Sequence, residues 1–248
     1  IQPLDSGSFD VAQVIRLLDK LGYKGSVGLQ HYGIRGDAEQ NLGRSMAGWR
    51  GLQARSGAEK LPLMPGGDLS AFEDKAAWFP AAEVGLDPEN AKKLIGKKPG
   101  GAAVLNGPGG RSGHLVTKRE FGDVEAHIEF MISGSSNSGA YFMGRYEVQV
   151  YDSHGVVKDK YPGLECGGIY PRWIGGKNVE GHSPRLNVSR PPGEWQSFHV
   201  IFRAPRFDKD GKKIANAKFE EGWHNGSLIH ENLELKGPTR AGIGGGES

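Results

Sequence analysis

Hydrophobic and polar residues alternate strictly along three stretches in the second half of the chain: DVEAHIEFMI, YEVQVYD and WQSFHVIFRA. Successive side chains of a β-strand point to opposite faces, so this period of two predicts strands with one apolar and one polar face. The apolar faces carry Val124, Ala126, Ile128, Phe130 and Ile132, then Tyr146, Val148 and Val150, then Phe198, Val200 and Phe202. Gly-rich turns and no helices separate these strands, which favours a mainly β fold, an antiparallel β-sandwich, over residues 76–248.

Residues 1–55 follow a different period. Apolar residues recur there at helical spacing in two stretches, at Val11, Val14, Leu18 and Leu21 and at Leu42, Met46, Trp49 and Leu52. The segment SVGLQHYGI between them is a short apolar strand. A helix, a strand and a helix form a short α/β fragment that cannot close a sheet alone. Residues 56–75 lose the periodicity and contain Pro and Gly, so we expect a linker there.

The composition limits what the chain binds. It has 248 residues, 37% hydrophobic and 24% charged, which is enough for a sizeable core. A formal net charge of +2 gives no basic field for nucleic acid or an acidic membrane surface. No apolar run approaches the roughly 20 residues of a membrane span. The single cysteine, Cys166, excludes an internal disulfide and a cysteine-rich metal site.

Both ends of the chain look cut. The sequence starts with Ile1 rather than Met, shows no signal peptide, and ends in the loop GIGGGES without a closing element. An export signal could have been lost, so a periplasmic or secreted location is compatible with the sequence. The compartment itself stays unknown.

Two of the predicted strands carry dense sets of polar side chains on their second face, Glu125, His127 and Glu129 on one and Arg145, Glu147 and Gln149 on the other. If that face curves into a groove, these groups would converge on a ligand. Carboxylates and amides hydrogen-bond sugar hydroxyls, and a pair of carboxylates can act as general acid and base. An ordinary solvated sheet face would carry the same residue types.

Aromatic residues are the second feature of a carbohydrate site. Tyr141, Tyr170, Trp173 and Trp195 lie in strands or adjoining loops, and aromatic faces stack on sugar rings, although packing in the core explains any single one as well. We expect Trp195 in the core and Trp173 at the surface.

The sequence identifies no cofactor and supports no divalent metal site, because no His-x-His or His-x-x-x-His pair occurs. RFDKDGKK lacks the later ligands of a calcium loop and predicts a charged hairpin tip.

Three motifs, SNSGAYFMGRYEVQVYDS, PPGEWQSFHVIFRAPRFD and HNGSLIHENLELKGPT, together resemble the 3-keto-disaccharide hydrolase family. The resemblance covers about residues 76–248 and implies a concanavalin-like jelly roll that cleaves or hydrates 3-keto sugars. It also implies that Glu147, Gln149 and Asp152 lie in or beside the active groove, with Asn137 of the first motif as a further sugar contact. The family often has Arg where Met143 stands here, and its closing strands after GIGGGES are missing.

Residues 1–55 resemble the C-terminal end of a sugar-phosphate isomerase/epimerase-type TIM barrel. Such barrels bind a divalent metal at the C-terminal ends of their strands. Only one strand is present, so no metal site follows from it.

The leading functional prediction is an enzyme that acts on 3-keto-glycosides, with a mono- or oligosaccharide substrate. Glu147 is the expected base, His127 a partner acid or base, and Arg145 a contact for the oxyanion. The alternatives are a non-catalytic carbohydrate-binding module and a glucanase-like glycoside hydrolase, which Gln149 disfavours because it occupies the place of a second carboxylate. The sugar, its linkage and the oligomeric state do not follow from the sequence.

Overall fold

The computed structural model describes residues 61–157 and 163–243, together with a few isolated positions before residue 38. The chain divides into two compact units, Ile1–Pro62 and Leu63–Ser248. In the first unit Val14, Leu17 and Leu18 are helical, and Leu21 N donates to Leu17 O over 2.9 Å, as expected for the first predicted helix. The strand and second helix predicted in residues 1–55 lie outside the described residues, so the barrel fragment stays a prediction.

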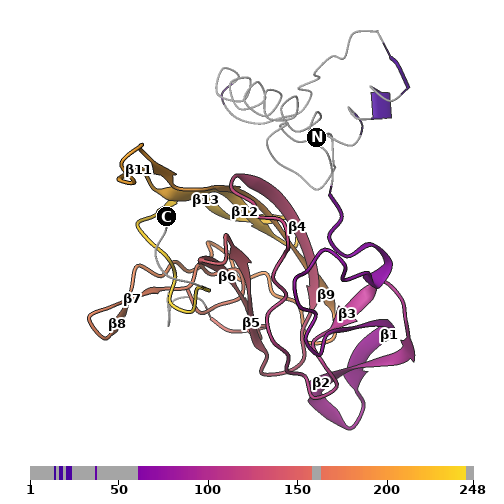
Figure 1. Ribbon diagram of the computed structural model, residues 1–248. Coiled ribbons are helices and arrows are strands. Elements are labelled where there is room, and N and C mark those ends of the chain that lie inside the picture. The colour runs from indigo at the N-terminus through magenta and orange to yellow at the C-terminus, as the bar shows by residue number, and fades with distance from the viewer. Residues whose placement is uncertain are drawn as a thin grey trace. The chain divides into compact units, whose positions relative to one another are not determined.

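The second unit consists almost entirely of strands (Figure 1). Its elements are η1 (Pro65–Gly67), β1 (Phe79–Asp87), β2 (Asn90–Pro99), β3 (Ala103–Leu105), β4 (Val124–Met131), β5 (Asn137–Phe142), β6 (Tyr146–Tyr151), β7 (Arg172–Ile174), β8 (Lys177–Val179), β9 (Trp195–Arg203), β10 (Arg206–Phe207), β11 (Lys213–Ala215), β12 (Ala217–His224) and β13 (Ser227–Leu235). Residues 63–75, which the sequence predicted as linker, belong to this unit, where Phe72 is buried and bridges Thr117.

One layer is a four-stranded antiparallel sheet in the order β13-β12-β9-β4. The register between β4 and β9 is regular from Val124 opposite Phe202 to Met131 opposite Trp195. The pairs β9–β12 and β12–β13 each contain an irregularity, near Glu221 and near Gly222. Such bulges increase the local twist of a sheet.

The second layer contains the antiparallel pair β5–β6, in which Phe142 lies opposite Tyr146 and Asn137 opposite Tyr151. On the other edge of β6, Val148 bridges Ile169, and Ile169 in turn bridges His182. Both links are short, but they extend the layer sideways beyond β6 toward the β7–β8 hairpin.

The core lies between these two layers. It contains the apolar faces of β6 and β9 together with residues from β5, β12 and β13: Phe142, Tyr146, Val148, Val150, Phe198, Val200, Phe202, Ala217, Phe219 and Leu235. Partly buried residues of β4, Val124, Ala126, Ile128 and Phe130, pack against it. The predicted antiparallel β-sandwich is therefore confirmed, with the predicted apolar faces turned inward.

The two tryptophan predictions have different outcomes. Trp173 on β7 is 50% exposed, as expected. Trp195, expected in the core, is 46% exposed, and that prediction is wrong. Trp195 is the first residue of β9 and lies opposite Met131, so it occupies the outward parity of a strand whose inward residues begin at Gln196 and Phe198.

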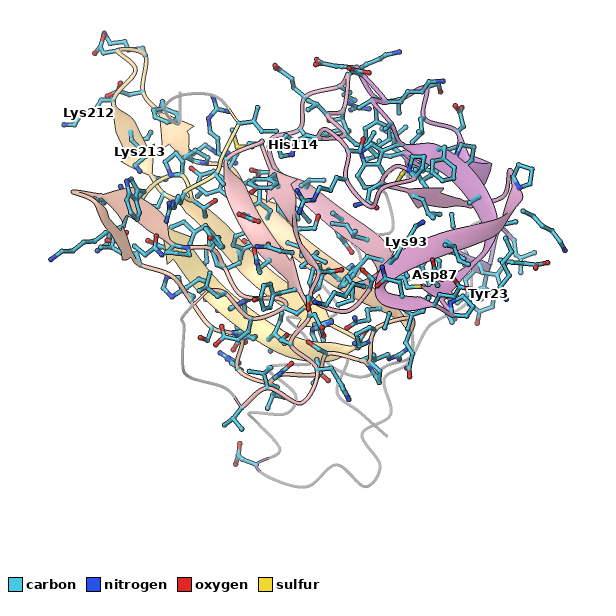
Figure 2. All side chains as sticks on the ribbon, turned by 90° about the horizontal axis from the view of Figure 1, so that it is seen from below. Tyr23, Asp87, Lys93, His114, Lys212 and Lys213 are labelled. Carbon is cyan, nitrogen blue, oxygen red and sulfur yellow. The ribbon has the colours of Figure 1, made fainter. Side chains whose placement is uncertain are left out.

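Two smaller features complete the unit. A three-stranded sheet, β2-β1-β3, precedes the sandwich in sequence. The β10–β11 hairpin carries the charged tip predicted from RFDKDGKK, with Lys212 and Lys213 at its end (Figure 2). The Asp208 carboxylate accepts from the backbone N of Asp210 and of Lys212, which closes this turn.

Candidate functional site

Glu147 and Gln149 leave β6 on the face opposite the core. Tyr146, Val148 and Val150 fill the core, so the alternation of the strand turns the two polar side chains the other way. They are nevertheless enclosed, since Glu147 is 4% and Gln149 1% exposed. A buried carboxylate and a buried amide on an outer sheet face need specific partners.

Three residues form a row across this layer: Tyr141, Glu147 and Tyr170. Tyr141 of β5 lies directly opposite Glu147, and its phenol donates a hydrogen bond to the carboxylate. On the other side, Tyr170 N donates to Glu147 O over 3.1 Å. The backbone N of Glu147 donates to Thr239 Oγ1, also over 3.1 Å. Tyr141 thus holds the carboxylate of Glu147, while Tyr170 and Thr239 hold its backbone.

The electrostatics of the row follow from this enclosure. Burial raises the pKa of the Glu147 carboxyl, and the hydrogen bond from Tyr141 partly lowers it again. Burial and the adjacent carboxylate raise the pKa of the Tyr141 phenol far above its ordinary value. Arg145 is not among the groups that shift the pKa of Glu147, although the sequence predicted a close approach. Its Nη1 donates to Met143 O over 3.1 Å.

Gly139 makes room for the Glu147 carboxylate. It lies opposite Gln149 in the β5–β6 register, two pairs along from Tyr141 and therefore on the same face. A Cβ at this position would overlap a carboxylate oxygen of Glu147. Any larger residue would therefore displace the carboxylate, so this glycine is required by close approach.

Gln149 is positioned by its neighbours on both edges. Its Nε2 donates to Asn137 Oδ1 over 3.0 Å, and its backbone N donates to Gly168 O over 2.8 Å. Its Oε1 is buried and has no hydrogen-bond partner among the described residues. Of the residues predicted from the sequence, the structure thus places Asn137 against Gln149, and Tyr141 and Tyr170 against Glu147.

Asp152 has a different place. Its carboxylate accepts from the backbone N of Ser135 over 2.7 Å, and its own backbone N donates to Ser136 O over 3.1 Å. Ser135 has a φ of 59°, a left-handed conformation. Asp152 therefore holds the turn that leads into β5, and through it the position of Asn137.

The polar face of β4 is not part of the Glu147 row. Glu125, His127 and Glu129 lie on the four-stranded sheet, whereas Glu147 and Gln149 lie on the β5–β6 layer. Both strands turn their apolar residues toward the same core, so their polar faces point away from each other. The prediction that the two sets share one face is wrong, and with it the pairing of His127 with Glu147. Glu125 instead contacts His199 of β9, with 3.2 Å between Oε1 and Nε2.

Sequence reasoning missed two neighbours of the row. His114 lies in the segment between β3 and β4 (Figure 2). Its ring stands edge-on against that of Tyr141, with centroids 6.2 Å apart and planes at 80°. Thr239, which binds the Glu147 backbone, follows β13 by four residues. Both residues lie outside regular strands, so alternation gave no signal for either.

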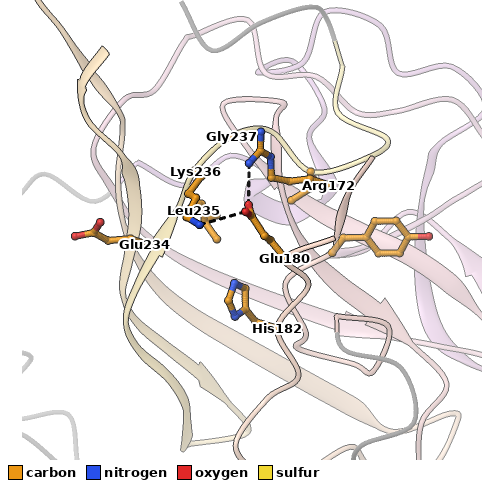
Figure 3. A pocket seen from close by; sticks show the side chains of 9 residues that line it. Arg172, Glu180, His182, Glu234, Leu235, Lys236 and Gly237 are labelled. Atoms are coloured by element: carbon orange, nitrogen blue, oxygen red, sulfur yellow. Dashed lines mark hydrogen bonds and ion pairs between the residues drawn. The ribbon is translucent and has the colours of Figure 1, made fainter. Parts of the chain in front are cut away.

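A cavity of about 120 Å³ lies beside the row (Figure 3). Tyr170 and Thr239 line it together with Arg172, Glu180 and His182. Arg172 Nη1 contacts a carboxylate oxygen of Glu180 at 2.7 Å, and Lys236 Nζ contacts the other at 3.3 Å. Burial lowers the pKa of His182, with the Glu180 charge acting in the opposite direction. The cavity therefore holds one carboxylate that is paired with two cations, together with a neutral imidazole.

Trp173 provides an aromatic surface on the neighbouring β7. The Arg240 guanidinium lies over its ring, 3.8 Å from the centroid. Arg240 is fixed in turn, because its backbone N donates to Pro171 O over 2.7 Å. One face of the indole is thus occupied by a cation, and half of the side chain remains open to solvent.

Within residues 61–157 and 163–243 and the isolated positions before them, no three His, Cys, Asp or Glu side chains come together in a way that could hold a metal ion. Among these same residues, no helix has the length and apolar character needed to cross a membrane.

Comparison with known proteins places the chain in a family. Residues 41–244, most of the chain, match the family described as the 3-keto-alpha-glucoside-1,2-lyase-like domain. The match includes residues 41–55, which the sequence had assigned to the barrel fragment. A solved structure from Parabacteroides distasonis ATCC 8503, provisionally described as a glycosyl hydrolase, is 26% identical with a TM-score of 0.46 and covers 75% of this chain and 73% of that chain.

No curated protein matches the chain. The family match alone makes this a carbohydrate-active protein, in agreement with the three motifs that carried the resemblance. The chain belongs to the 3-keto-alpha-glucoside-1,2-lyase-like domain family.

Proposed function

We propose that this protein cleaves 3-keto-glycosides by removing the proton at C2 of the sugar, with Glu147 as the base. The observation that carries the proposal is the enclosed Glu147 carboxylate, held by the Tyr141 phenol on the outer face of β6. The family match supports action on carbohydrates, and the arrangement of the row supports this chemistry.

The reaction uses the acidity that a ketone confers on its neighbour. The base takes the C2 proton, and the electron pair of that bond forms an enolate with the C3 ketone. The enolate then re-forms the ketone while a C1–C2 double bond appears, and the C1 substituent leaves with the electrons of its bond to C1. Addition of water at C1 of this enone, with a proton returned to C2, gives the free 3-keto sugar.

The environment of Glu147 suits this role. A carboxylate whose pKa is raised by burial is a stronger base than one in water, and a hydrogen-bond donor stabilises its charged form. The Tyr141 phenol is that donor, and it also fixes the direction of the carboxylate. A row of this kind meets the requirement that a base be oriented before the substrate arrives.

The amide of Gln149 supplies the first expected contact with the sugar. Its unpaired Oε1 needs a donor, and a sugar hydroxyl is such a donor. Because Glu147 is only 4% exposed, the sugar has to displace the side chains that cover the row. Binding energy from the sugar hydroxyls is available for this displacement.

Replacement of Glu147 by Gln tests the proposal. Glu147→Gln keeps the shape but removes the base, so turnover of a 3-keto-glucoside should fall by roughly 10²–10⁴, as is usual for general acid–base groups. Glu129→Gln is the matched control, because it changes an exposed carboxylate on the other sheet. The first variant should also fold, since it removes the cost of burying a charge. Full activity of folded Glu147→Gln would exclude this carboxylate as the base.

A second candidate is carbohydrate binding without catalysis, which the half-exposed Trp173 favours. An indole backed by the Arg240 guanidinium is a flat platform on which a sugar ring can stack. In that case an unoxidised sugar should bind, Trp173→Ala should abolish this binding, and Glu147→Gln should leave it unchanged. If the protein turns over a 3-keto-glycoside and Glu147→Gln removes that turnover, the protein is an enzyme rather than a binding module.

A further inference from the structure

We propose that His114 is the proton donor for the leaving group, the acid that works together with the base Glu147. The inference rests on the proposed function, since it assigns a second catalytic residue to the same site. Three features of the molecule support it: the contact of the imidazole with Tyr141, the bonds that hold the segment around His114, and the places of the other histidines.

The proposed cleavage requires a proton at the C1 oxygen as well as a base at C2. When the bond between C1 and this oxygen breaks, its electron pair goes to the oxygen, and an unprotonated alkoxide is a poor leaving group. A side chain that delivers a proton to the oxygen acts as a general acid. Imidazole is the side chain that most readily gives and takes a proton near neutral pH. A histidine is therefore the most suitable residue for this role.

Tyr141 connects His114 with the base. Its phenol donates a hydrogen bond to the Glu147 carboxylate, and its ring meets the imidazole of His114 edge-on, with the centroids 6.2 Å apart. His114 is exposed to solvent, whereas Glu147 is only 4% exposed. One tyrosine thus places an accessible imidazole next to an enclosed carboxylate. An acid and a base that act on adjacent carbons of one sugar have to lie close together in this way.

The segment around His114 is fixed on both sides. Before it, Trp78 Nε1 donates to Gly113 O over 2.7 Å. After it, Glu73 N donates to Val116 O over 2.8 Å. These bonds hold the backbone without using the imidazole, so the ring is presented beside Tyr141 from a fixed position. A catalytic group has to be positioned in this manner before the substrate arrives.

The other histidines in the part of the chain that the structure describes have different places. Two are on the outer face of the four-stranded sheet, two face inward from β12 and β13, one follows β6, and one bridges a core residue: His127 and His199, His224 and His230, His154, and His182. The bridge joins His182 to Ile169 of the core, and directly opposed residues share a face of a sheet. His114 is thus the described histidine whose ring meets the residue that binds the Glu147 carboxylate.

Glu147 and His114 together return to their starting states in one cycle. Glu147 takes the C2 proton, and the enolate expels the C1 oxygen, which takes the proton of the His114 imidazolium. The neutral imidazole then accepts a proton from the water that adds at C1. Glu147 returns its proton to C2 of the sugar. The cycle consumes only the glycoside and one water, and it releases the free 3-keto sugar and the protonated leaving group.

The test compares two leaving groups. Methoxide, expelled from methyl 3-keto-glucoside, needs a proton, whereas the nitrophenolate expelled from 4-nitrophenyl 3-keto-glucoside is stable without one. His114→Ala should lower kcat/KM for the methyl glycoside by roughly 10²–10⁴ and leave kcat/KM for the nitrophenyl glycoside nearly unchanged. Glu147→Gln should lower both, because both substrates lose the C2 proton. His127→Ala is the matched control, since it removes an exposed imidazole from the other sheet, and it should lower neither.

Deuterium at C2 of the methyl glycoside provides a second readout. In the unaltered protein the deuterated substrate should react more slowly, because removal of the C2 proton limits the rate. In His114→Ala the departure of methoxide becomes the slow step, so the isotope effect should largely disappear. An isotope effect that persists in the slowed variant would show that His114 acts on proton removal, which overturns its role as the acid.

Thermal melting checks that His114→Ala is folded. If it is not, His114→Gln takes its place with the same expectations, because an amide keeps a polar side chain but cannot transfer the proton. Equal losses with both glycosides, or no loss with the methyl glycoside, would overturn the role of His114, while a loss of both activities in Glu147→Gln would still support the base. If the unaltered protein turns over neither glycoside, the proposed function is wrong and the role of His114 with it.

Discussion

Glu147 shows how one residue can be both predictable and unexpected. The alternation of YEVQVYD gives its face correctly, because Tyr146 and Val148 occupy the core. Its burial, to 4% exposure, is not visible in the sequence, since it depends on Tyr141, Tyr170 and Thr239 from three other segments. The glycine that accommodates its carboxylate, Gly139, is part of the NSG motif, but only the strand register shows what that glycine is for.

The hydrogen bond between Tyr141 and Glu147 predicts a shift in the pH dependence of activity. This bond lowers the pKa of Glu147, so Tyr141→Phe should raise that pKa further. A base acts in its deprotonated form, and the acid limb of the kcat/KM profile should therefore move to higher pH. Measurement of kcat/KM across pH for the variant and the unaltered protein checks this. An acid limb in the same place would mean that Glu147 is not the group that titrates.

At the scale of elements, the sequence predicts strands far better than it predicts sheets. The strands β4, β6 and β9 appear where alternation places them, with the predicted inward residues. Alternation does not say which strands share a sheet, so it predicts one common polar face for β4 and β6, although β4 pairs with β9 in the other sheet. The cavity was not predictable either, because segments 170–182 and 234–239 meet only through the fold.

Two inward-facing histidines make the strands β12 and β13 sensitive to acid. His224 of β12 is fully buried, and its Nε2 lies 3.0 Å from Gln196 Oε1. His230 of β13 lies 2.7 Å from Gly167 O through its Nε2. Burial lowers the pKa of each to about 4 from an ordinary value of 6.5. Arg190 near His224, and His182 and Arg185 near His230, act in the same direction, whereas the Gly167 bond opposes it.

The sign of this effect follows from which state binds protons. Between pH 6.5 and 4 the histidines bind protons in the unfolded chain but not in the folded protein, where they are buried. The free energy of unfolding therefore falls as the pH is lowered. At pH 5 the loss should be on the order of 2 kcal/mol for each histidine. Urea unfolding at pH 7 and pH 5 measures it. His230→Gln should reduce the loss and the exposed His127→Gln should not; equal loss in both variants would contradict this origin.

At the scale of the whole molecule, the candidate site belongs to one of the two units. The core, the Glu147 row and the cavity all lie within residues 63–248. The family match starts earlier, at residue 41, so the family boundary and the structural boundary differ. The boundary between the two units, at Pro62 and Leu63, falls inside the linker that the sequence predicts at residues 56–75. Residues 63–75 belong to the second unit, since loss of periodicity marks the absence of regular elements rather than the edge of a packed unit.

Removal of residues 1–60 should therefore leave the second unit folded and active. Phe72 and the segment around it are retained, and so is every residue of the site. Thermal melting and kcat/KM on a 3-keto-glucoside should both stay close to those of the full chain. A truncated protein that melts normally but has lost turnover would show that the first unit contributes to catalysis.

The central claim is that the C2 proton leaves during the reaction, and deuterium at C2 tests it most directly. Turnover of a 3-keto-glucoside that carries deuterium at C2 should be slower than that of the protiated sugar, and the released 3-keto sugar should have lost the deuterium to water. Equal rates, with the deuterium retained in a product analysed before it can exchange, would contradict the account and indicate direct hydrolysis at C1.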